Sequence, residues 1–276
     1  MDASDLMTRD PLTVRAETRC DSALDIMDDE DIRHLPVVDA RGRLCGIVSD
    51  RDLLGVVGWP NRGPSVSPST GLPGMVGDCM SKDVTTVEPE DSLVTATVAM
   101  SLAHVGCLPV VAGDQLVGIV SETDVAAAFW RASRDGRHAD VEAPVGELMT
   151  REPLTIGPDT TLAAATQLCR EGHFRHLPVV HQGKLLGVLS DRDLCTAFGN
   201  HRGGSTPAAE ALVHSPLTTT PTTPLSEAVE VLVGHRISSL PVLDGEQLVG
   251  ILTVTDVLDH CMNHLHDPES GASTRP

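Results

Sequence analysis

Aromatic residues are nearly absent from the sequence, which contains no tyrosine, three phenylalanines and two tryptophans. Proteins that bind single-stranded nucleic acid stack bases on aromatic side chains, and this chain has too few to form such a surface. Positive charge is scarce as well. The formal net charge is −19 at pH 7, whereas affinity for nucleic acid comes mainly from basic side chains that neutralise phosphates. We therefore expect no nucleic acid among the partners of this protein.

Long apolar runs, a secretion signal and paired cysteines are also missing. No apolar run approaches the ~20 residues that span a bilayer, and the acidic segment 1–5 lacks the apolar region of a signal peptide. We expect a cytoplasmic protein without membrane contact. The cysteines number seven and none forms a Cys-x-x-Cys pair, so neither a disulfide framework nor a structural zinc site is predicted. Only Lys82 and Lys184 are lysines, which suggests a bacterial genome of high G+C content.

The motifs of common enzyme classes are absent too. There is no phosphate-binding Gly-x-x-x-x-Gly-Lys, no Gly-x-Ser-x-Gly and no His-Glu-x-x-His. We expect no catalytic residue, no catalytic cofactor and no enzymatic activity. His260 and His264 stand four residues apart, a spacing at which two histidines of a helix can bind a metal. A polar helix end, where histidine interacts favourably with the helix dipole, is the favoured interpretation, and no metal site is predicted.

One pattern occurs four times along the chain. It consists of a Leu-Pro-Val run followed, after a turn, by Gly-h-h-(Ser/Thr)-x-x-Asp, in which h is an aliphatic residue. The leucine stands at positions 35, 108, 177 and 240, and an alanine precedes it at a constant offset in every copy. Such a repeat indicates one structural unit used several times. The four motif aspartates are Asp52, Asp124, Asp193 and Asp256.

Each unit is predicted to contain a short extended segment, a helix, two strands and a second helix. In the third copy, Leu162 and Cys169 share one helix face. Residues 177–180 then form a buried strand and Gly183 a hairpin turn, since glycine tolerates positive φ. Ser190 opens the second helix. We therefore predict an α/β (α+β) chain of four β-α-β-β-α repeats.

The repeats are separated by segments rich in Pro, Gly, Ser or charge. Repeats 1 and 3 share Arg-His before Leu-Pro and an arginine inside the motif, whereas repeats 2 and 4 share Gln-Leu-Val-Gly-Ile. A two-repeat unit that was duplicated explains this alternation. The predicted boundaries are 1–58, 78–130, 145–198 and 210–265 for the repeats, 59–77, 131–144 and 199–209 for the linkers, and 266–276 for a disordered tail.

These residues resemble the CBS (cystathionine-β-synthase) domain, a β-α-β-β-α module that works in pairs called Bateman modules. The resemblance covers the chain apart from its linkers and tail, and it is specific because four copies agree in motif and spacing. It implies two Bateman modules, residues 1–130 and 144–265, which stack head to head or head to tail into a disc. One such chain can form a disc alone or pair with a second copy as a homodimer.

The resemblance also implies a ligand, because CBS domains bind AMP, ADP or ATP (with Mg²⁺ possible beside ATP) in clefts between paired repeats. By carry-over, the motif aspartate holds the ribose and the Ser or Thr three residues earlier approaches the phosphate. An upstream Thr and its successor line the base, and residues around Leu-Pro form the cleft edge. The implied nucleotide-binding residues are Thr13, Val14, Arg33, His34, Pro36, Ser49, Arg51, Asp52, Thr86, Val87, Pro109, Ser121, Thr123, Asp124, Thr155, Ile156, Arg175, His176, Pro178, Ser190, Arg192, Asp193, Thr218, Thr219, Pro241, Thr253, Thr255 and Asp256.

The chemistry of these residue types agrees with that assignment. An ionised carboxylate can accept hydrogen bonds from a ribose diol, each worth roughly 1.5–3 kcal/mol. A helix N-terminus offers free N–H groups and a positive dipole to a phosphate. Aliphatic and proline side chains supply an apolar slot for the base.

Two structural interpretations compete with the nucleotide assignment. Ser/Thr-x-x-Asp resembles a capping box, in which the two side chains cap the start of a helix. In a single copy the cap is favoured, whereas four copies favour the ribose contact, and both roles can coexist. The Arg-His pairs Arg33-His34 and Arg175-His176 are either solvated or phosphate-binding. Because repeats 1 and 3 also carry Arg51 and Arg192, we predict that these repeats are the better phosphate binders.

The functional expectation is a cytoplasmic, non-catalytic regulator that senses adenine nucleotides and signals to an unidentified partner protein. A scaffold with empty clefts is one alternative. Another keeps the fold but binds S-adenosylmethionine, a dinucleotide or a metal ion; S-adenosylmethionine lacks phosphates and would not need Arg33 or Arg175.

Overall fold

The computed structural model describes residues 1–57, 74–134, 142–172, 174–199 and 204–265. The predicted linkers lie partly outside these ranges, and the predicted tail lies wholly outside them. Repeat 1 contains α1 (Ala3–Leu6), β1 (Thr8–Arg9), α2 (Cys20–Asp29), β2 (His34–Val38), β3 (Leu44–Ser49) and α3 (Asp50–Val57). Repeat 2 contains α4 (Val76–Cys79), α5 (Leu93–Ala103), β4 (Cys107–Ala112), β5 (Gln115–Ser121) and α6 (Glu122–Arg134).

The second half of the chain repeats this order. Repeat 3 contains α7 (Val145–Leu148), β6 (Thr150–Arg151), α8 (Leu162–Gly172), β7 (His176–His181), β8 (Lys184–Ser190) and α9 (Asp191–Gly199). Repeat 4 contains the 3-10 helix η2 (Ala208–Glu210), β9 (Val213–His214), α10 (Leu225–Gly234), β10 (Ser239–Asp244), β11 (Gln247–Thr253) and α11 (Val254–Leu265). The predicted α/β class and the four repeats are confirmed.

Each repeat packs two helices against one antiparallel hairpin. The leucine of every Leu-Pro pair is fully buried in its strand, and the alanine upstream of it is buried on the first helix. Burial of one such leucine side chain contributes about 1.5–3 kcal/mol. The hairpin turns carry Gly42, Gly113, Gly183 and Gly245 at φ values between 60° and 80°, as the turn prediction requires.

The extended segment before the first long helix is short, as predicted, and it pairs with the hairpin of its own repeat through a single residue. In repeat 1, Val14 makes one parallel bridge to Val37. The Val14 N–H donates to the Pro36 carbonyl at 3.1 Å, and the Val38 N–H donates to the Val14 carbonyl at 3.0 Å. The chain then turns, since the Thr18 N–H donates to the Arg15 carbonyl at 3.0 Å, so pairing ends after one residue.

The repeats of each module exchange their leading segments, by which we mean the short helix and extended residues before the first long helix. In module 1, β1 of repeat 1 pairs with β5 of repeat 2, and Ser81 of repeat 2 bridges Ile47 of repeat 1. In module 2, β6 pairs with β11 and β9 pairs with β8. Each repeat therefore completes the sheet of its neighbour, which explains why the repeats work in pairs.

The glycine of the repeated motif permits this exchange. A Cβ atom on Gly118 would lie 2.3 Å from Sδ of Met7, and one on Gly187 would lie 2.3 Å from the Val213 carbonyl oxygen. Both distances are far below van der Waals contact. The motif glycine is thus required by the leading segment of the paired repeat.

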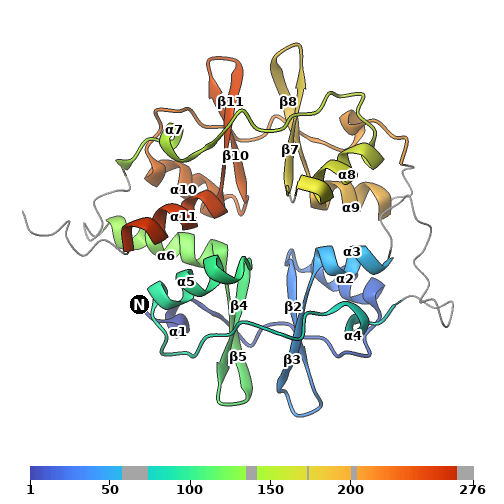
Figure 1. Ribbon diagram of the computed structural model, residues 1–276, viewed down its shortest axis with the longest axis vertical. Coiled ribbons are helices and arrows are strands. Elements are labelled where there is room, and N and C mark those ends of the chain that lie inside the picture. Colours follow the sequence, from blue (N-terminus) through green and yellow to red (C-terminus); the bar gives the residue numbers. More distant parts are fainter. Residues whose placement is uncertain (58–73, 135–141, 173, 200–203, 266–276) are drawn as a thin grey trace, which may run out of the picture.

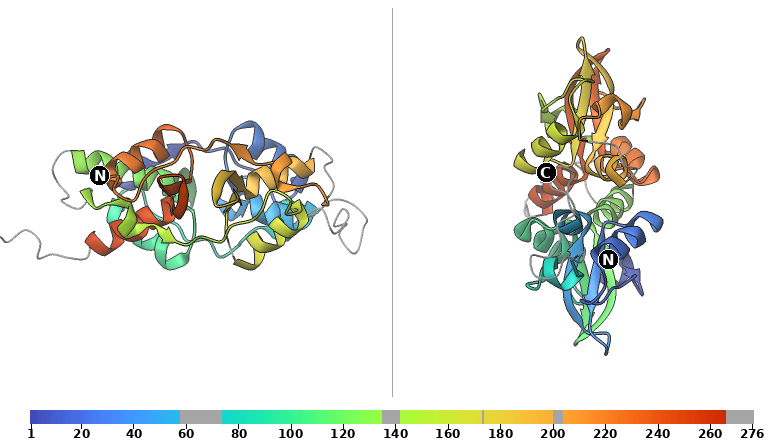
Figure 2. Two further views of the ribbon diagram at one scale, coloured as in Figure 1. Left: turned by 90° about the horizontal axis from the view of Figure 1, so that it is seen from above. Right: turned by 90° about the vertical axis from the view of Figure 1, so that its right-hand side faces the viewer.

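The two modules stack into a flattened disc in which the hairpin turns point outward at the two ends (Figures 1 and 2). Repeat 1 faces repeat 3 and repeat 2 faces repeat 4, so the modules meet head to head (Figure 1). The single chain forms the disc that the resemblance implied.

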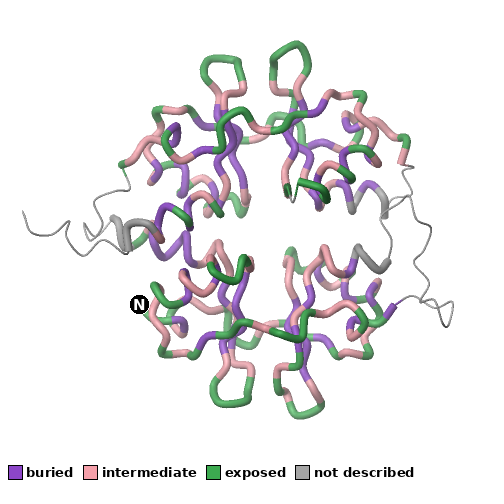
Figure 3. Tube along the Cα trace, viewed as in Figure 1, coloured by how far each residue is buried: buried purple, intermediate pink, exposed green. Residues whose placement is uncertain are grey.

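The two seams between the modules differ in chemistry. In the apolar seam, α6 packs against α10 and α11, and α11 also contacts α5. Ala126 and Phe129 of repeat 2 belong to the hydrophobic core of repeat 4, and Leu258 of repeat 4 belongs to the core of repeat 2. Repeats 1 and 3 differ from this: among the described residues, the core of repeat 1 includes no residue of repeat 3, and the core of repeat 3 includes none of repeat 1. Figure 3 shows buried residues along the strands and inner helix faces and exposed residues at the hairpin turns.

Among the helices described, none combines the length and the apolar character needed to cross a membrane.

Candidate ligand-binding site

The motif Ser or Thr and Asp form a helix cap in all four repeats. In repeat 3, Oδ2 of Asp193 accepts hydrogen bonds from the Ser190 N–H at 2.7 Å and from the Ser190 hydroxyl at 2.6 Å. The Asp193 N–H donates back to the Ser190 hydroxyl at 3.1 Å. The same bonds join Ser49 with Asp52, Ser121 with Asp124, and Thr253 with Asp256. The capping-box interpretation therefore holds.

This cap uses one carboxylate oxygen and leaves the other available. Asp124 Oδ2 accepts the Ser121 N–H at 2.8 Å and the Ser121 hydroxyl at 2.6 Å. No donor in the described part of the chain is within hydrogen-bonding distance of Asp124 Oδ1. A ligand hydroxyl can bind there without breaking the cap, so the two interpretations of the motif are compatible.

A cavity of about 590 Å³ includes the motif of repeat 2 and residues of all four repeats. Its motif side is formed where β5 ends and α6 begins, at Ser121 to Asp124. Opposite repeats supply arginine side chains, and the leading segment of repeat 1 supplies Pro11 and Leu12. The lining residues are Thr8, Asp10, Pro11, Leu12, Glu30, Asp31, Ile32, Arg33, His34, Gly106, Cys107, Ile119, Ser121, Glu122, Thr123, Asp124, Arg175, Arg192, Arg236, Ile237, Ser238 and Val254.

The cavity brings together some of the predicted binding residues and omits others. It contains Arg33, His34, Ser121, Thr123, Asp124, Arg175 and Arg192. The motif aspartates Asp52, Asp193 and Asp256 are not in its lining. Neither is Thr13, which is exposed, nor Val14, which lies in the core of repeat 1. Val87 and Ile156, the successors of Thr86 and Thr155, are likewise core residues.

Sequence reasoning missed the residues that only the exchange of leading segments brings to the site. Pro11 and Leu12 reach the motif of repeat 2 because β1 pairs with β5. Leu12 is 48 % exposed, and its counterparts Leu154 and Leu217 are each 44 % exposed. The recurring Pro-Leu before the upstream threonine was the available signal. Arg236 of repeat 4 does not stand at the position of the Arg-His pairs, so the sequence carried no signal for it.

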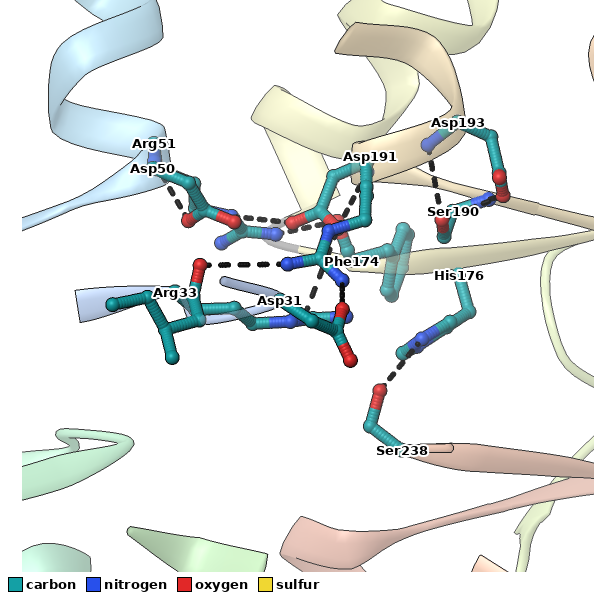
Figure 4. A network of polar contacts seen from close by, with 12 residues as sticks. Asp31, Arg33, Asp50, Arg51, Phe174, His176, Ser190, Asp191, Asp193 and Ser238 are labelled. Atoms are coloured by element: carbon teal, nitrogen blue, oxygen red, sulfur yellow. Dashed lines mark hydrogen bonds and ion pairs between the residues drawn. The ribbon is translucent and has the colours of Figure 1, made fainter. Parts of the chain in front are cut away.

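The arginines of repeats 1 and 3 meet at what we call the polar seam, formed by Asp31, Arg33, Arg51, Asp191 and Arg192. Arg51 Nε lies 3.2 Å from Oδ2 of Asp191, whose side chain is only 3 % exposed. Arg51 also donates to the Phe174 carbonyl at 2.8 Å. Arg192 pairs with Asp31 in the reverse direction. Figure 4 shows Arg51 and Asp191 facing each other from α3 and α9.

Two cavity arginines are outside the ion pairs seen among the described residues. Arg175 and Arg236 form neither an ion pair nor a side-chain hydrogen bond within the described ranges. Arginines of repeats 1 and 3 line a cavity whose motif aspartate belongs to repeat 2. The sequence-based assignment of phosphate binding to single repeats did not anticipate this arrangement.

Burial and positive charge shift the pKa values of titratable groups in and near the cavity. Burial raises the pKa of the Glu122 carboxyl, although Arg175 and Arg33 oppose this effect. Burial and the cations Arg175 and Arg33 lower the pKa of His34 to about 4. Burial also lowers the pKa of His176 to about 4. His176 Nε2 lies 3.0 Å from the Ser238 hydroxyl of repeat 4 (Figure 4). Both imidazoles are therefore neutral near pH 7.

No group of three or more potential metal ligands is found in the described part of the chain. His260 is buried on α11. The side chain of His264 lies outside the described residues, so the two-histidine alternative is not tested.

Comparison with known proteins agrees with the observed fold. The protein YhcV of Bacillus subtilis, a CBS domain-containing protein, is 32 % identical over 132 residues, covering 47 % of this chain and 91 % of YhcV. The uncharacterized protein MJ1225 of Methanocaldococcus jannaschii is 25 % identical over 270 residues, covering 90 % of this chain and 94 % of MJ1225. The crystal structure of MJ1225 matches with a TM-score of 0.79 at 22 % identity, covering 95 % of this chain and 100 % of that one.

Inosine-5′-monophosphate dehydrogenase of Korarchaeum cryptofilum is 34 % identical over 114 residues, but these cover 41 % of this chain and 22 % of the enzyme. The family model described as CBS domain matches residues 3–58, 76–131, 145–200 and 208–263. Because these four segments make up most of the chain, the protein belongs to the CBS-domain family, with four repeats paired into two Bateman modules.

Proposed function

We propose that the protein is a non-catalytic regulator that binds an adenine nucleotide, AMP, ADP or ATP, in the cavity at Asp124 and signals its occupancy to a partner protein. One observation carries the proposal. The same cavity holds an unused carboxylate oxygen of Asp124, the N-terminus of α6, and the guanidinium groups of Arg175 and Arg236, which have no ion-pair partner in the described chain. These groups are complementary to a ribose and an anionic phosphate.

Each part of a nucleotide has suitable chemistry within this cavity. Asp124 Oδ1 accepts ribose hydroxyl hydrogens. The N–H groups at the start of α6 and the arginines bind the phosphate. Pro11, Leu12 and Ile119 offer apolar surface to the base. The volume of about 590 Å³ falls within the roughly 300–1,000 Å³ typical of small-molecule sites.

Signalling follows from the position of the cavity between the modules. A ligand held by Asp124 of module 1 and by Arg175 and Arg236 of module 2 interacts with both. Such a ligand shifts the equilibrium between two arrangements of the modules by its difference in affinity for them. Dissociation constants between about 1 μM and 1 mM, or roughly −8 to −4 kcal/mol, suit a sensor of cellular nucleotides.

The first prediction concerns Asp124. We expect Asp124→Ala to weaken binding of AMP, ADP or ATP by about 10- to 100-fold, since two charge-assisted hydrogen bonds to the ribose are lost. Isothermal titration calorimetry measures this change. Asp256→Ala is the matched control, because it removes the same type of helix cap outside the cavity lining.

Failure of all three nucleotides to bind the wild-type protein would refute the proposal and favour a scaffold with empty clefts. Binding of S-adenosylmethionine without AMP, unaffected by Arg175→Ala, would instead support the phosphate-free ligand. A thermal-shift screen separates these alternatives, because a bound ligand raises the midpoint of unfolding.

A further inference from the structure

The cavity contains a carboxylate that is already bound to one of its arginines. Arg192 of repeat 3 and Asp31 of repeat 1 both line the cavity, and their side chains form an ion pair across the polar seam. The second guanidinium nitrogen of Arg192 donates to the Ile32 carbonyl at 3.4 Å, a long contact. Arg192 is thus a cavity arginine that already binds a carboxylate of the protein, and this carboxylate also lines the cavity.

The Asp31 side chain is poorly restrained. It is 56 % exposed, and Arg192 is its ion-pair partner. Asp31 lies in the turn after α2, and its backbone has a left-handed φ of 54°. Asp191, by contrast, is 3 % exposed and is approached by both Arg51 and Arg33. Of the two acids of the polar seam, Asp31 is the one that can leave its arginine readily.

A phosphate uses the same positions on a guanidinium group as a carboxylate does, because both accept two parallel N–H donors. A phosphate monoester carries about −1.5 to −2 charges at pH 7, whereas a carboxylate carries one. An ion pair between partly exposed side chains is weak. A phosphate in the cavity that Arg175, Arg236 and Arg192 line can therefore compete with Asp31 for Arg192.

We propose that Asp31 is a specificity-determining residue that competes internally with the phosphate of the ligand for Arg192. This proposal rests on the proposed function. Asp31 holds Arg192 until the phosphate of a nucleotide displaces it, whereas a nucleoside without phosphate leaves the pair intact. Asp31 consequently reduces affinity for anionic ligands only, and each binding event breaks one contact between repeats 1 and 3.

The test compares AMP with adenosine by calorimetry. Asp31→Asn is expected to bind AMP about 3- to 10-fold more tightly than the wild type while its affinity for adenosine is unchanged. Asp25→Asn is the matched control, since it removes the same charge from an exposed position of α2 outside the cavity lining. We expect it to leave the affinities for both ligands within about twofold.

A double-mutant cycle separates direct competition from general charge repulsion. In the Arg192→Gln background, Asp31→Asn is expected to change AMP affinity by less than about twofold, because the contested arginine is gone. An equal gain in both backgrounds, or an unchanged ratio of AMP to adenosine affinity in Asp31→Asn, would overturn the competition. If neither ligand binds any variant, it is the proposed function that fails.

Discussion

At the scale of single residues, the motif side chains have a structural role that does not exhaust their hydrogen-bonding capacity. The cap engages Oδ2 of each motif aspartate, and at Asp124 no donor among the described residues binds Oδ1. The arginines differ in the same way. Arg51 is committed to Asp191 and the Phe174 carbonyl, whereas Arg175 has no such partner in the described chain. Residue identity alone could not separate a committed arginine from an available one.

Two partly buried histidines predict a loss of stability in mild acid. His34 and His176 have pKa values of about 4 in the folded protein, against 6.5 for an unperturbed imidazole. The unfolded chain therefore binds protons first as the pH falls. Their contribution to stability is complete above pH ~6.5 and is lost between there and pH ~4, by at most about 2 kcal/mol for each imidazole at pH 5.

Chemical denaturation at pH 7 and pH 5 measures this effect. His34→Gln together with His176→Gln should reduce the difference in unfolding free energy between the two pH values. His181→Gln, at an exposed position of β7, should leave the difference unchanged. The raised pKa of Glu122 acts in the opposite direction, so the comparison of variants is more informative than the wild-type curve. Identical pH dependence in all three proteins would contradict the prediction.

At the scale of elements, the exchange of leading segments explains both the pairing of repeats and the composition of the site. Each hairpin pairs with the leading segment of its neighbour, as β5 pairs with β1. The contact is close enough that the accepting strand needs a glycine. The same exchange carries Leu12 to the cavity beside Asp124. A stability test of a motif glycine therefore tests whether this close approach between paired repeats is required.

Gly187→Ala is expected to destabilise the protein by about 1–3 kcal/mol, since its Cβ would lie 2.2 Å from Leu212 Cδ1 and 2.3 Å from the Val213 oxygen. Gly157→Ala is the control, because no atom lies within 4 Å of its Cβ position. It should be neutral or stabilising by up to about 1 kcal/mol. Urea denaturation distinguishes the two, and equal effects would show that the close approach is not required.

At the scale of the whole molecule, the disc has one seam built as a shared hydrophobic core and one built from ion pairs. At the apolar seam, Phe129 lies in the core of the opposing repeat. At the polar seam, Arg51 forms an ion pair with Asp191. Apolar burial is not screened by salt, whereas an ion pair between partly exposed groups, such as Arg192 with Asp31, is screened. Ionic strength should therefore weaken the contact between repeats 1 and 3 more than the contact between repeats 2 and 4.

Arg51→Ala tests this difference. It removes a cation that lies 3.2 Å from the buried Asp191, so we expect a loss of about 1–3 kcal/mol at the polar seam. Hydrogen–deuterium exchange should become faster in α3 and α9 and stay unchanged in α6 and α11. Arg19→Ala breaks an exposed ion pair with Asp21 on α2 and should have little effect on stability or on exchange in the four helices. Uniformly faster exchange in all four helices would contradict two independent seams.

The sequence by itself determined the repeats, their helices and hairpins, and the helix caps, because these depend on local periodicity, turn glycines and side chains three residues apart. It also indicated the family and the motif aspartates. Only the tertiary structure decided which residues share one cavity. Leu12, Asp124 and Arg175 come from three different repeats, and no local pattern records that β1 crosses to β5 or that repeat 1 faces repeat 3. Contacts between distant segments depend on how whole faces of the repeats pack against each other. The sequence therefore indicated that arginines bind the phosphate, but it did not show which motif aspartate they accompany.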